Sequence, residues 1–273
     1  MNGCEIKNQI FSFLTEKMAE ADQTGIIKQI WGTPILRFGD ARRAEYNDFK
    51  TLIHPEHLTP CEILPEAKTI IAYFLPFREE IGNSNKNGKY ASVEWAKAYE
   101  KTNAFFAEFN EDLISFLEDR GYRAAVSSEA TTYDEERLVS KWSQRHFAYY
   151  CGLGTFGIHN MLITEAGCCG RVSTVVTDLD VEHDGPVSEE YCLYKKDGSC
   201  GACTKHCSAG ALTLSGYDRK KCDAFCTENA SLHVGYCDTP SYELPNGLVG
   251  SNCCGKCLIG VPCTFQKPKG RSE

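Results

Sequence analysis

The stretch CGACTKHC at residues 200–207 has the cysteine spacing C-x2-C-x3-C. A second stretch, CGKC at residues 254–257, is followed by Cys263 and gives C-x2-C-x5-C, with Cys222 between the two stretches. Two residues between cysteines let both thiolates reach one iron–sulfur cluster while backbone N–H groups of the turn point at the sulfurs. The pattern predicts that the C-terminal third of the chain binds two [4Fe–4S] clusters.

The ligands of the two clusters are predicted to cross between the stretches. In two-cluster ferredoxins the last cysteine of a compact C-x2-C-x2-C-x3-C-P run reaches the other cluster. By that rule one cluster is held by Cys200, Cys203 and Cys263, and the other by Cys207, Cys222, Cys254 and Cys257. The first set is one ligand short, because the third cysteine of the run is missing here. An open iron or one of several residues could complete it: Cys192, His206, Cys226, Cys237 or Cys253.

Cysteine is frequent and unevenly distributed along the chain. Of 16 cysteines in 273 residues, Cys4 and Cys61 fall in the first 150 residues, and the others lie between Cys151 and Cys263. The start of the chain lacks the apolar block of a signal peptide, and no run of 18 or more apolar residues occurs. We therefore expect a cytoplasmic protein with no membrane partner, whose reduced thiols bind metal and do not form disulfides.

Zinc is the main alternative metal. One structural zinc site with four cysteine ligands would use both C-x2-C pairs but would leave the other cysteines without a role. The thiols of Cys4, Cys61, Cys168 and Cys169 are expected to be ordinary buried groups.

The formal net charge of -8 argues against duplex nucleic acid as a partner, because phosphate binding needs clustered Lys and Arg.

The pattern of apolar residues predicts an α+β fold. Ile6, Ile10, Leu14 and Met18 recur at steps of four and predict a helix over residues 5–21. We expect an α/β-type domain over residues 1–188 and a small ferredoxin-like domain over residues 189–273. The other elements are predicted from apolar runs and turn residues: strands at 68–75, 122–127, 161–164 and 171–179, helices at 93–120 and 134–150, and a loop at 79–92.

A glycine-rich loop precedes the strand expected at 161–164. Its glycines, Gly152, Gly154 and Gly157, match G-x-G-x-x-G. A dinucleotide-binding fingerprint needs a strand before the loop and a helix after it, whereas here a helix precedes and a strand follows. The loop is therefore either a tight helix-to-strand turn or a bare backbone segment that lies against a flat cofactor.

Several stretches together resemble the epoxyqueuosine reductases, which are cobalamin-dependent enzymes of tRNA modification with two [4Fe–4S] clusters and are related to the reductive dehalogenases. The likeness spans roughly residues 60–265. It rests on CGLGTFGIHNMLI at 151–163, VSTVVTDLDVE at 172–182, CGACTKHCSAGAL at 200–212, YDRKKC at 217–222 and CGKC at 254–257.

The resemblance implies a cobalamin that lies against the α/β domain and receives electrons from a cluster. By position, it places Gly152, Gly154, Gly157 and Asn160 in the corrinoid pocket and makes Thr177 and Asp178 the T-D pair of the family's strand. It also implies a ferredoxin- or flavodoxin-type electron donor and a small-molecule or nucleoside substrate.

The chain departs from the family pattern in two respects. The family's acidic motif D-[ST]-x-P-x-x-E is missing before the glycine loop, so Asp134 is the candidate proton donor, with Glu129, Tyr133 or His146 as alternatives. The other interpretation of each of these residues is a solvated or helix-capping side chain. The helical-repeat extension that helps the family hold tRNA is not seen after Cys263, which makes tRNA a doubtful partner.

Besides a structural zinc module, the sequence is consistent with two functions. The first is an iron–sulfur and cobalamin-dependent reductase. The second is an electron-transfer protein that reduces or reactivates a separate corrinoid protein and has no substrate of its own.

Overall fold

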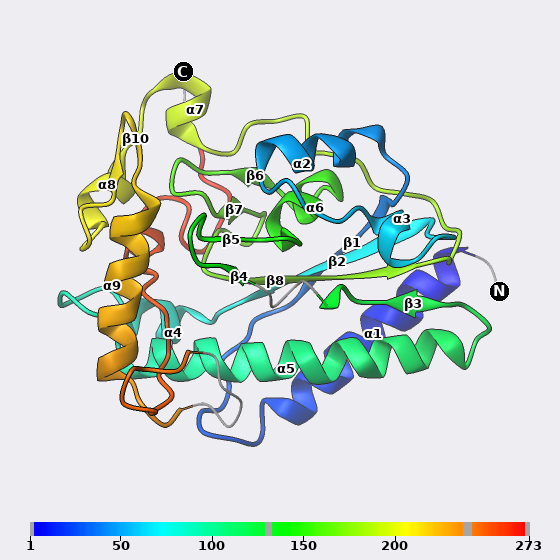
Figure 1. The fold of residues 1–273 in the computed structure, drawn as a ribbon, viewed down its shortest axis with the longest axis horizontal. Coiled ribbons are helices and arrows are strands. Elements are labelled where there is room, and N and C mark those ends of the chain that lie inside the picture. Colours follow the sequence, from blue (N-terminus) through cyan, green and yellow to red (C-terminus); the bar gives the residue numbers. More distant parts are fainter. Residues whose placement is uncertain (1–2, 129–132, 237–241, 271–273) are drawn as a thin grey trace.

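The computed structural model describes residues 3–128, 133–236 and 242–270. A four-stranded antiparallel sheet with the order β1-β2-β8-β3 lies at its centre (Figure 1). Its strands are β1 (Ile35–Asp40), β2 (Thr69–Pro76), β8 (Gly170–Thr177) and β3 (Ala124–Ala125). The expected α+β class is therefore confirmed.

Strand β2 is buried along its whole length because both faces of the sheet are covered. Ile71, Tyr73 and Leu75 belong to the core that includes α1 (Gly3–Ala21) and α5 (Val93–Glu118). Alternate residues of the strand face the opposite core, which contains α2 (Phe49–Leu52) and α6 (Gln144–Tyr150). Figure 1 shows α1 and α5 on one side of the sheet and α2 and α6 on the other.

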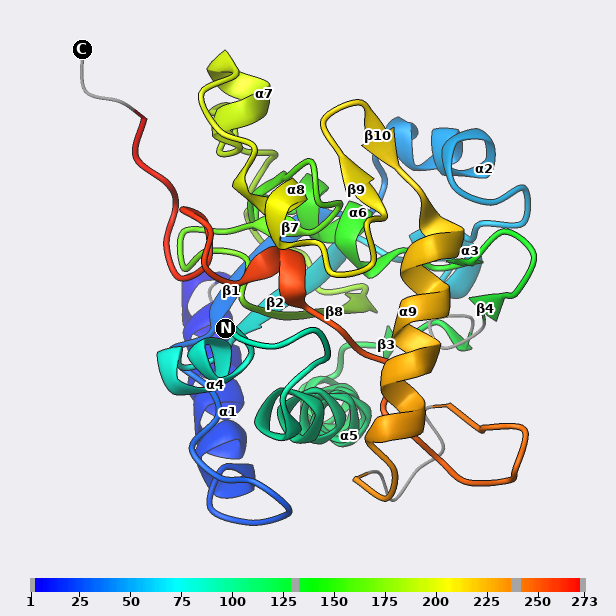
Figure 2. The same ribbon diagram turned by 90° about the vertical axis from the view of Figure 1, so that its left-hand side faces the viewer.

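The cysteine-rich segment lies at one end of the sheet (Figures 1 and 2). Its elements are α7 (Leu193–Asp197), α8 (Ala202–His206), β9 (Leu212–Thr213), β10 (Gly216–Tyr217), α9 (Arg219–Leu232) and the 3-10 helix η3 (Lys256–Leu258). One continuous core joins α1, α5 and buried residues of this segment, among them Cys192, Cys203, Leu258 and Cys263. The core does not divide near residue 188, so the division into two domains stays a prediction.

Three expected elements differ from the structure. The segment expected as one helix over 134–150 begins with a hairpin of β4 (Tyr133–Asp134) and β5 (Val139–Ser140), and only α6 is helical. The expected loop at 79–92 contains α4 (Glu79–Ser84). The glycine-rich loop contains β6 (Thr155–Phe156), which pairs with β7 (Leu162–Ile163).

The remaining short elements precede β2: the 3-10 helix η1 (Ala44–Asp48) and α3 (Pro60–Ile63), which begins with a capping box formed by Thr59 and Glu62. In the part of the chain described by the structure, no helix has both the length and the apolar character needed to cross a lipid bilayer.

Candidate iron–sulfur site

The three thiols of the first set and the thiol of Cys192 line one cavity. Cys192 is the residue before α7, Cys203 lies on α8 beside Cys200, and Cys263 follows η3. Burial raises the pKa of Cys203 to about 12, and the neighbouring thiols of Cys263, Cys192 and Cys200 act in the same direction. The four side chains therefore surround one space with the soft donors that a [4Fe–4S] cluster requires.

The cavity supports one of the open candidates for the missing ligand. Its lining includes Cys192 and does not include Cys226, Cys253 or His206. Cys237 lies outside the described residues. The spacing alone did not distinguish Cys192, because seven residues separate it from Cys200 and the polypeptide folds back through α7 to bring them together.

The second set, Cys207, Cys222, Cys254 and Cys257, also gathers in one place. Burial, followed by the neighbouring thiols of Cys254, Cys207 and Cys222, raises the pKa of Cys257 well above its ordinary value. A hydrogen bond from Cys226 lowers the pKa of Cys222, and Tyr217 acts in the same direction. The predicted set is thus complete in number, and two further side chains contact one of its sulfurs.

The CGKC turn of the second set is anchored on the N-terminal half of the chain. Lys256 is buried, and its ammonium donates hydrogen bonds to the carbonyls of Asn85 (2.9 Å) and Asn87 (2.7 Å). The Asn85 side chain donates to the carbonyl of Cys254 at 2.8 Å. Gly255 has a φ of 71°, and a Cβ there would overlap the ring of Trp95 on α5.

The glycine-rich loop packs against its own chain. A Cβ on Gly152 would overlap the carbonyl of Gly185, and one on Gly154 would overlap the carbonyl of Ile163. A Cβ on Gly157 would lie 2.5 Å from the ring of His159. Close packing within the protein therefore accounts for these glycines, and they do not present an open face to a corrinoid; their predicted cofactor role and that of Asn160 stay predictions.

The structure places His159, which the sequence reasoning missed, next to a predicted ligand. Its Nε2 atom lies 3.6 Å from the sulfur of Cys263, and the sulfur of Cys168 lies 3.9 Å from that Cys263 sulfur. Hydrogen bonds from Cys168 and then from His159 lower the pKa of Cys263. The only signal for His159 in the sequence was its position inside the glycine-rich loop.

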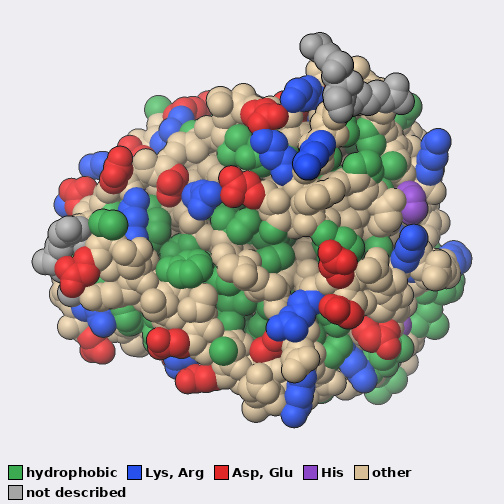
Figure 3. Space-filling view, turned by 180° about the vertical axis from the view of Figure 1, so that it is seen from behind, with side chains coloured by type: hydrophobic (Ala, Val, Ile, Leu, Met, Phe, Trp, Pro, Cys, Tyr) green, Lys and Arg blue, Asp and Glu red, His purple; other side chains and the backbone are tan. Residues whose placement is uncertain are grey.

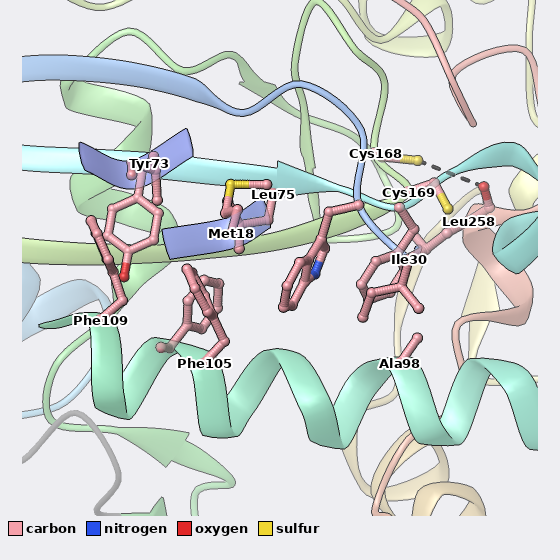
Figure 4. Close-up of a cluster of buried hydrophobic side chains, with 14 of the residues drawn as sticks. Met18, Ile30, Tyr73, Leu75, Ala98, Phe105, Phe109, Cys168, Cys169 and Leu258 are labelled. Atoms are coloured by element: carbon pink, nitrogen blue, oxygen red, sulfur yellow. Dashed lines mark hydrogen bonds between the residues drawn. The ribbon is translucent and has the colours of Figure 1, made fainter. Parts of the chain in front are cut away.

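Cys168 and Cys169 are buried as expected and lie at the edge of the apolar core (Figure 4). Cys4 and Cys61 are exposed, which corrects the prediction that their thiols are buried. Cys4 is on the outer side of α1, away from Ile6 and Ile10, and Cys61 is on the short helix α3.

Asp134 is held as a charged hydrogen-bond acceptor. Its carboxylate accepts hydrogen bonds from the backbone N–H groups of Glu136 (2.9 Å) and Arg137 (2.8 Å), from the Arg137 guanidinium (3.1 Å) and from His54 Nε2 (3.0 Å). The backbone N–H of Arg137 is the largest cause that lowers the pKa of Asp134 to about 2. The protonated form is scarce at neutral pH, so the proton-donor role stays a prediction that this environment does not favour.

The alternative proton donors receive no stronger support. Glu129 lies outside the described residues, and so does the side chain of Tyr133. His146 packs against Phe156, and burial lowers its pKa to about 4, so that it is neutral at pH 7.

Thr177 and Asp178 hold the edge of the sheet. The Thr177 hydroxyl donates to the carbonyl of Arg123 at 2.8 Å, and the Asp178 carboxylate accepts from the backbone N–H (2.8 Å) and guanidinium (3.1 Å) of Arg123. They lie at the end of β8 opposite Gly170, whereas the cysteines Cys168 and Cys169 precede Gly170. Their predicted cofactor role therefore stays a prediction.

These observations define the protein as an α+β protein with two four-thiol sites at one end of an antiparallel sheet. No family model matches the sequence, and no curated protein matches it either. Solved structures do share the fold. An epoxyqueuosine reductase from Bacillus subtilis is 18% identical, with a TM-score of 0.50, over 97% of this chain and 68% of that one.

Two further structures extend the comparison. An epoxyqueuosine reductase bound to an epoxyqueuosine-modified tRNA-Tyr stem loop is 19% identical, with a TM-score of 0.51, over 96% of this chain and 68% of that one. A catabolic reductive dehalogenase in complex with 3-bromo-4-hydroxybenzoic acid is 14% identical, with a TM-score of 0.56, over 86% of this chain and 30% of that one. The likeness expected from the sequence is thus confirmed at the level of fold.

Proposed function

We propose that this chain is an iron–sulfur oxidoreductase with two [4Fe–4S] clusters, one held by Cys192, Cys200, Cys203 and Cys263 and the other by Cys207, Cys222, Cys254 and Cys257. The observation that carries the proposal is the gathering of eight thiols into two sets of four. A single zinc site would need one set and would leave the other without a function.

The protein would bind and insulate these centres, whose own chemistry is the transfer of single electrons. Cys203 and Cys263 are buried, which limits the access of water and oxygen to the first site. Hydrogen bonds to Cys222 and Cys263 favour their thiolate forms, which are the forms that bind iron. Both sites share a core with the sheet, so their separation is fixed by packed structure.

The fold likeness supports cobalamin as the electron acceptor and a small molecule or nucleoside as the substrate. The space beside Gly152, Gly154 and Gly157 is filled by the chain itself, so the corrinoid contact would fall to other residues. One solved relative binds a tRNA stem loop. Here the net charge is -8, and Figure 3 shows basic and acidic side chains mixed on one face, so a nucleoside fits better than tRNA.

The second candidate is an electron-transfer protein that reduces a separate corrinoid protein. The environment of Asp134 favours this function, because its low pKa disfavours proton donation to a bound substrate. Cobalamin added to the iron-loaded protein separates the two. A base-off absorption spectrum supports the reductase, and failure to bind supports the electron-transfer protein.

Iron analysis of anaerobic protein tests the main proposal. The intact protein should contain about eight iron atoms per chain, and Cys192→Ala should contain about four if the first cluster is lost. Cys61→Ala, at an exposed thiol, is the matched control and should keep about eight. Protein without iron and acid-labile sulfide after chemical reconstitution would rule out the proposal, and a full iron complement in Cys192→Ala would rule out this ligand assignment.

A further inference from the structure

The sulfur of Cys263 has a nitrogen neighbour from the glycine-rich loop. His159 Nε2 lies 3.6 Å from this sulfur, within the longer range of hydrogen bonds to sulfur, and both side chains line the cavity of the first thiol set. His159 and Cys263 are 5% and 9% exposed, so water does not replace this contact. His159 is not one of the predicted ligands, so the cluster assignment does not explain why it lies here.

Its other ring nitrogen determines which atom carries the proton. The backbone N–H of Met161 donates to His159 Nδ1 at 3.2 Å. An Nδ1 atom that accepts a hydrogen bond has no proton, so in the neutral ring the proton is on Nε2. The Nε2–H group therefore points to Cys263 as a donor, and the sulfur is the acceptor.

The loop is shaped to hold the ring in this orientation. Gly157 has no side chain, and a Cβ there would lie 2.5 Å from the His159 ring. Asn160 adopts a left-handed φ of 60°, its N–H donates to the carbonyl of Gly157 at 3.0 Å, and its own carbonyl accepts a hydrogen bond from Arg145. Gly157 and the turn at Asn160 thus hold the ring of His159 in place. This structural role explains the G-x-x-G part of the loop without a bound nucleotide.

We propose that His159 is a positioning residue for the first cluster, whose N–H donates to the Cys263 sulfur and raises the reduction potential of that cluster. A donor at a ligand sulfur stabilises the additional negative charge of the reduced cluster. The inference rests on the proposed function, because it requires Cys263 to be a ligand.

The experiment is a redox titration of the full-length, cluster-loaded protein, followed by electron paramagnetic resonance. His159→Phe keeps the ring shape and removes the donor, so the reduction wave of the first cluster should move to a more negative potential. His159→Gln places an amide N–H near the position of Nε2 and should return the wave toward its original potential. His206→Phe is the matched control; it replaces a histidine beside Cys207 in the second set and should leave the first wave unchanged.

The outcomes separate this inference from the function on which it rests. Protein without iron contradicts the proposed function, whereas protein with two clusters and an unmoved wave in His159→Phe contradicts only the inference. Equal shifts in His159→Phe and His159→Gln indicate a packing effect and also contradict it. If His159→Phe loses the first cluster, Gly157→Ala decides: displacement of the ring should shift the wave negatively, and an unchanged wave overturns the proposal.

Discussion

His57 predicts that the stability of the protein falls on mild acidification. The side chain is fully buried, and its Nε2 accepts a hydrogen bond from the backbone N–H of Ser143 at 2.9 Å. The proton is therefore on Nδ1, which donates to the carbonyl of Leu58 at 2.8 Å. Protonation of Nε2 would set two N–H groups against each other, and burial is the largest cause that lowers the pKa of His57 to about 4.

The sign and size of the effect follow from this pKa. In the unfolded chain His57 takes up a proton below about pH 6.5, whereas the folded protein resists protonation until about pH 4. The stabilisation is present above the unfolded pKa and is lost as the pH falls toward the folded one. Between pH 7 and pH 5 the free energy of unfolding should fall by about 2 kcal/mol through this residue alone.

Urea unfolding under anaerobic conditions at pH 7, 6 and 5 measures this loss. Tryptophan fluorescence is a suitable signal, because Trp142 stacks on His57 with ring centroids 6.3 Å apart. The unfolding free energy of His57→Gln should fall by about 2 kcal/mol less than that of the unchanged protein over this pH range. His206→Gln serves as the control and should retain the full dependence. Parallel curves for His57→Gln and the unchanged protein would refute the reasoning.

Three further predictions concern the proposed second cluster and Asp134. Gly255→Ala should destabilise the fold by about 3 kcal/mol, because it combines left-handed backbone strain with overlap on Trp95. It should also lower the iron content of anaerobic protein, and a full iron complement in this variant would contradict the prediction. Asn85→Ala should lower the unfolding free energy by about 2 kcal/mol, because it leaves the carbonyl of Cys254 without the Asn85 amide donor. Asn83→Ala, at a neighbouring exposed position, is the control, and equal urea midpoints for the two variants would be inconsistent with this prediction. Asp134→Asn should keep the iron content of the unchanged protein, since its hairpin carries no proposed ligand; iron loss would assign the hairpin a role in cluster binding.

Elements with a strong apolar period were predictable from the sequence. Ile6, Ile10, Leu14 and Met18 are the buried residues of α1, and the expected strand at 68–75 is β2 with a shift of one residue. The helix at 93–120 is α5 to within two residues. In these segments the period of the side chains and the burial of one face agree, so local pattern and tertiary packing favour the same structure.

The segment 134–150 shows where this agreement ends. Asp134 was expected in the first turn of a helix, where acids are favoured. Its short side chain instead accepts hydrogen bonds from the N–H groups two and three residues later, which stabilises a turn and competes with the helix. His54, from a distant part of the chain, also contacts the carboxylate. No local pattern contains this contact, so the sequence alone could not indicate the hairpin.

The candidate site shows the same limit. Spacing predicted seven of the eight thiols that we propose as ligands, four of them in C-x2-C pairs, which place two ligands by local geometry. It could not choose Cys192 from the other candidates, because the choice depends on how α7 returns to the cavity. It also missed His159, whose contact with Cys263 joins residues separated by 104 positions.

If the proposed clusters bind, the contacts between the two halves of the chain imply that cluster binding and folding of the sheet stabilise each other. Asn229 on α9 accepts a hydrogen bond from the backbone N–H of Ala91 at 2.7 Å, and His233 contacts the carbonyl of Ala91 at 3.0 Å. Lys256 connects the CGKC turn to the segment after α4. A ligand that binds the folded state alone adds its binding free energy to the stability of every element in the same cooperative unit. Removal of iron should therefore destabilise α5 and β2 as well as the cysteine-rich segment, and hydrogen exchange that remains unchanged in β2 after iron removal would show that the halves are independent.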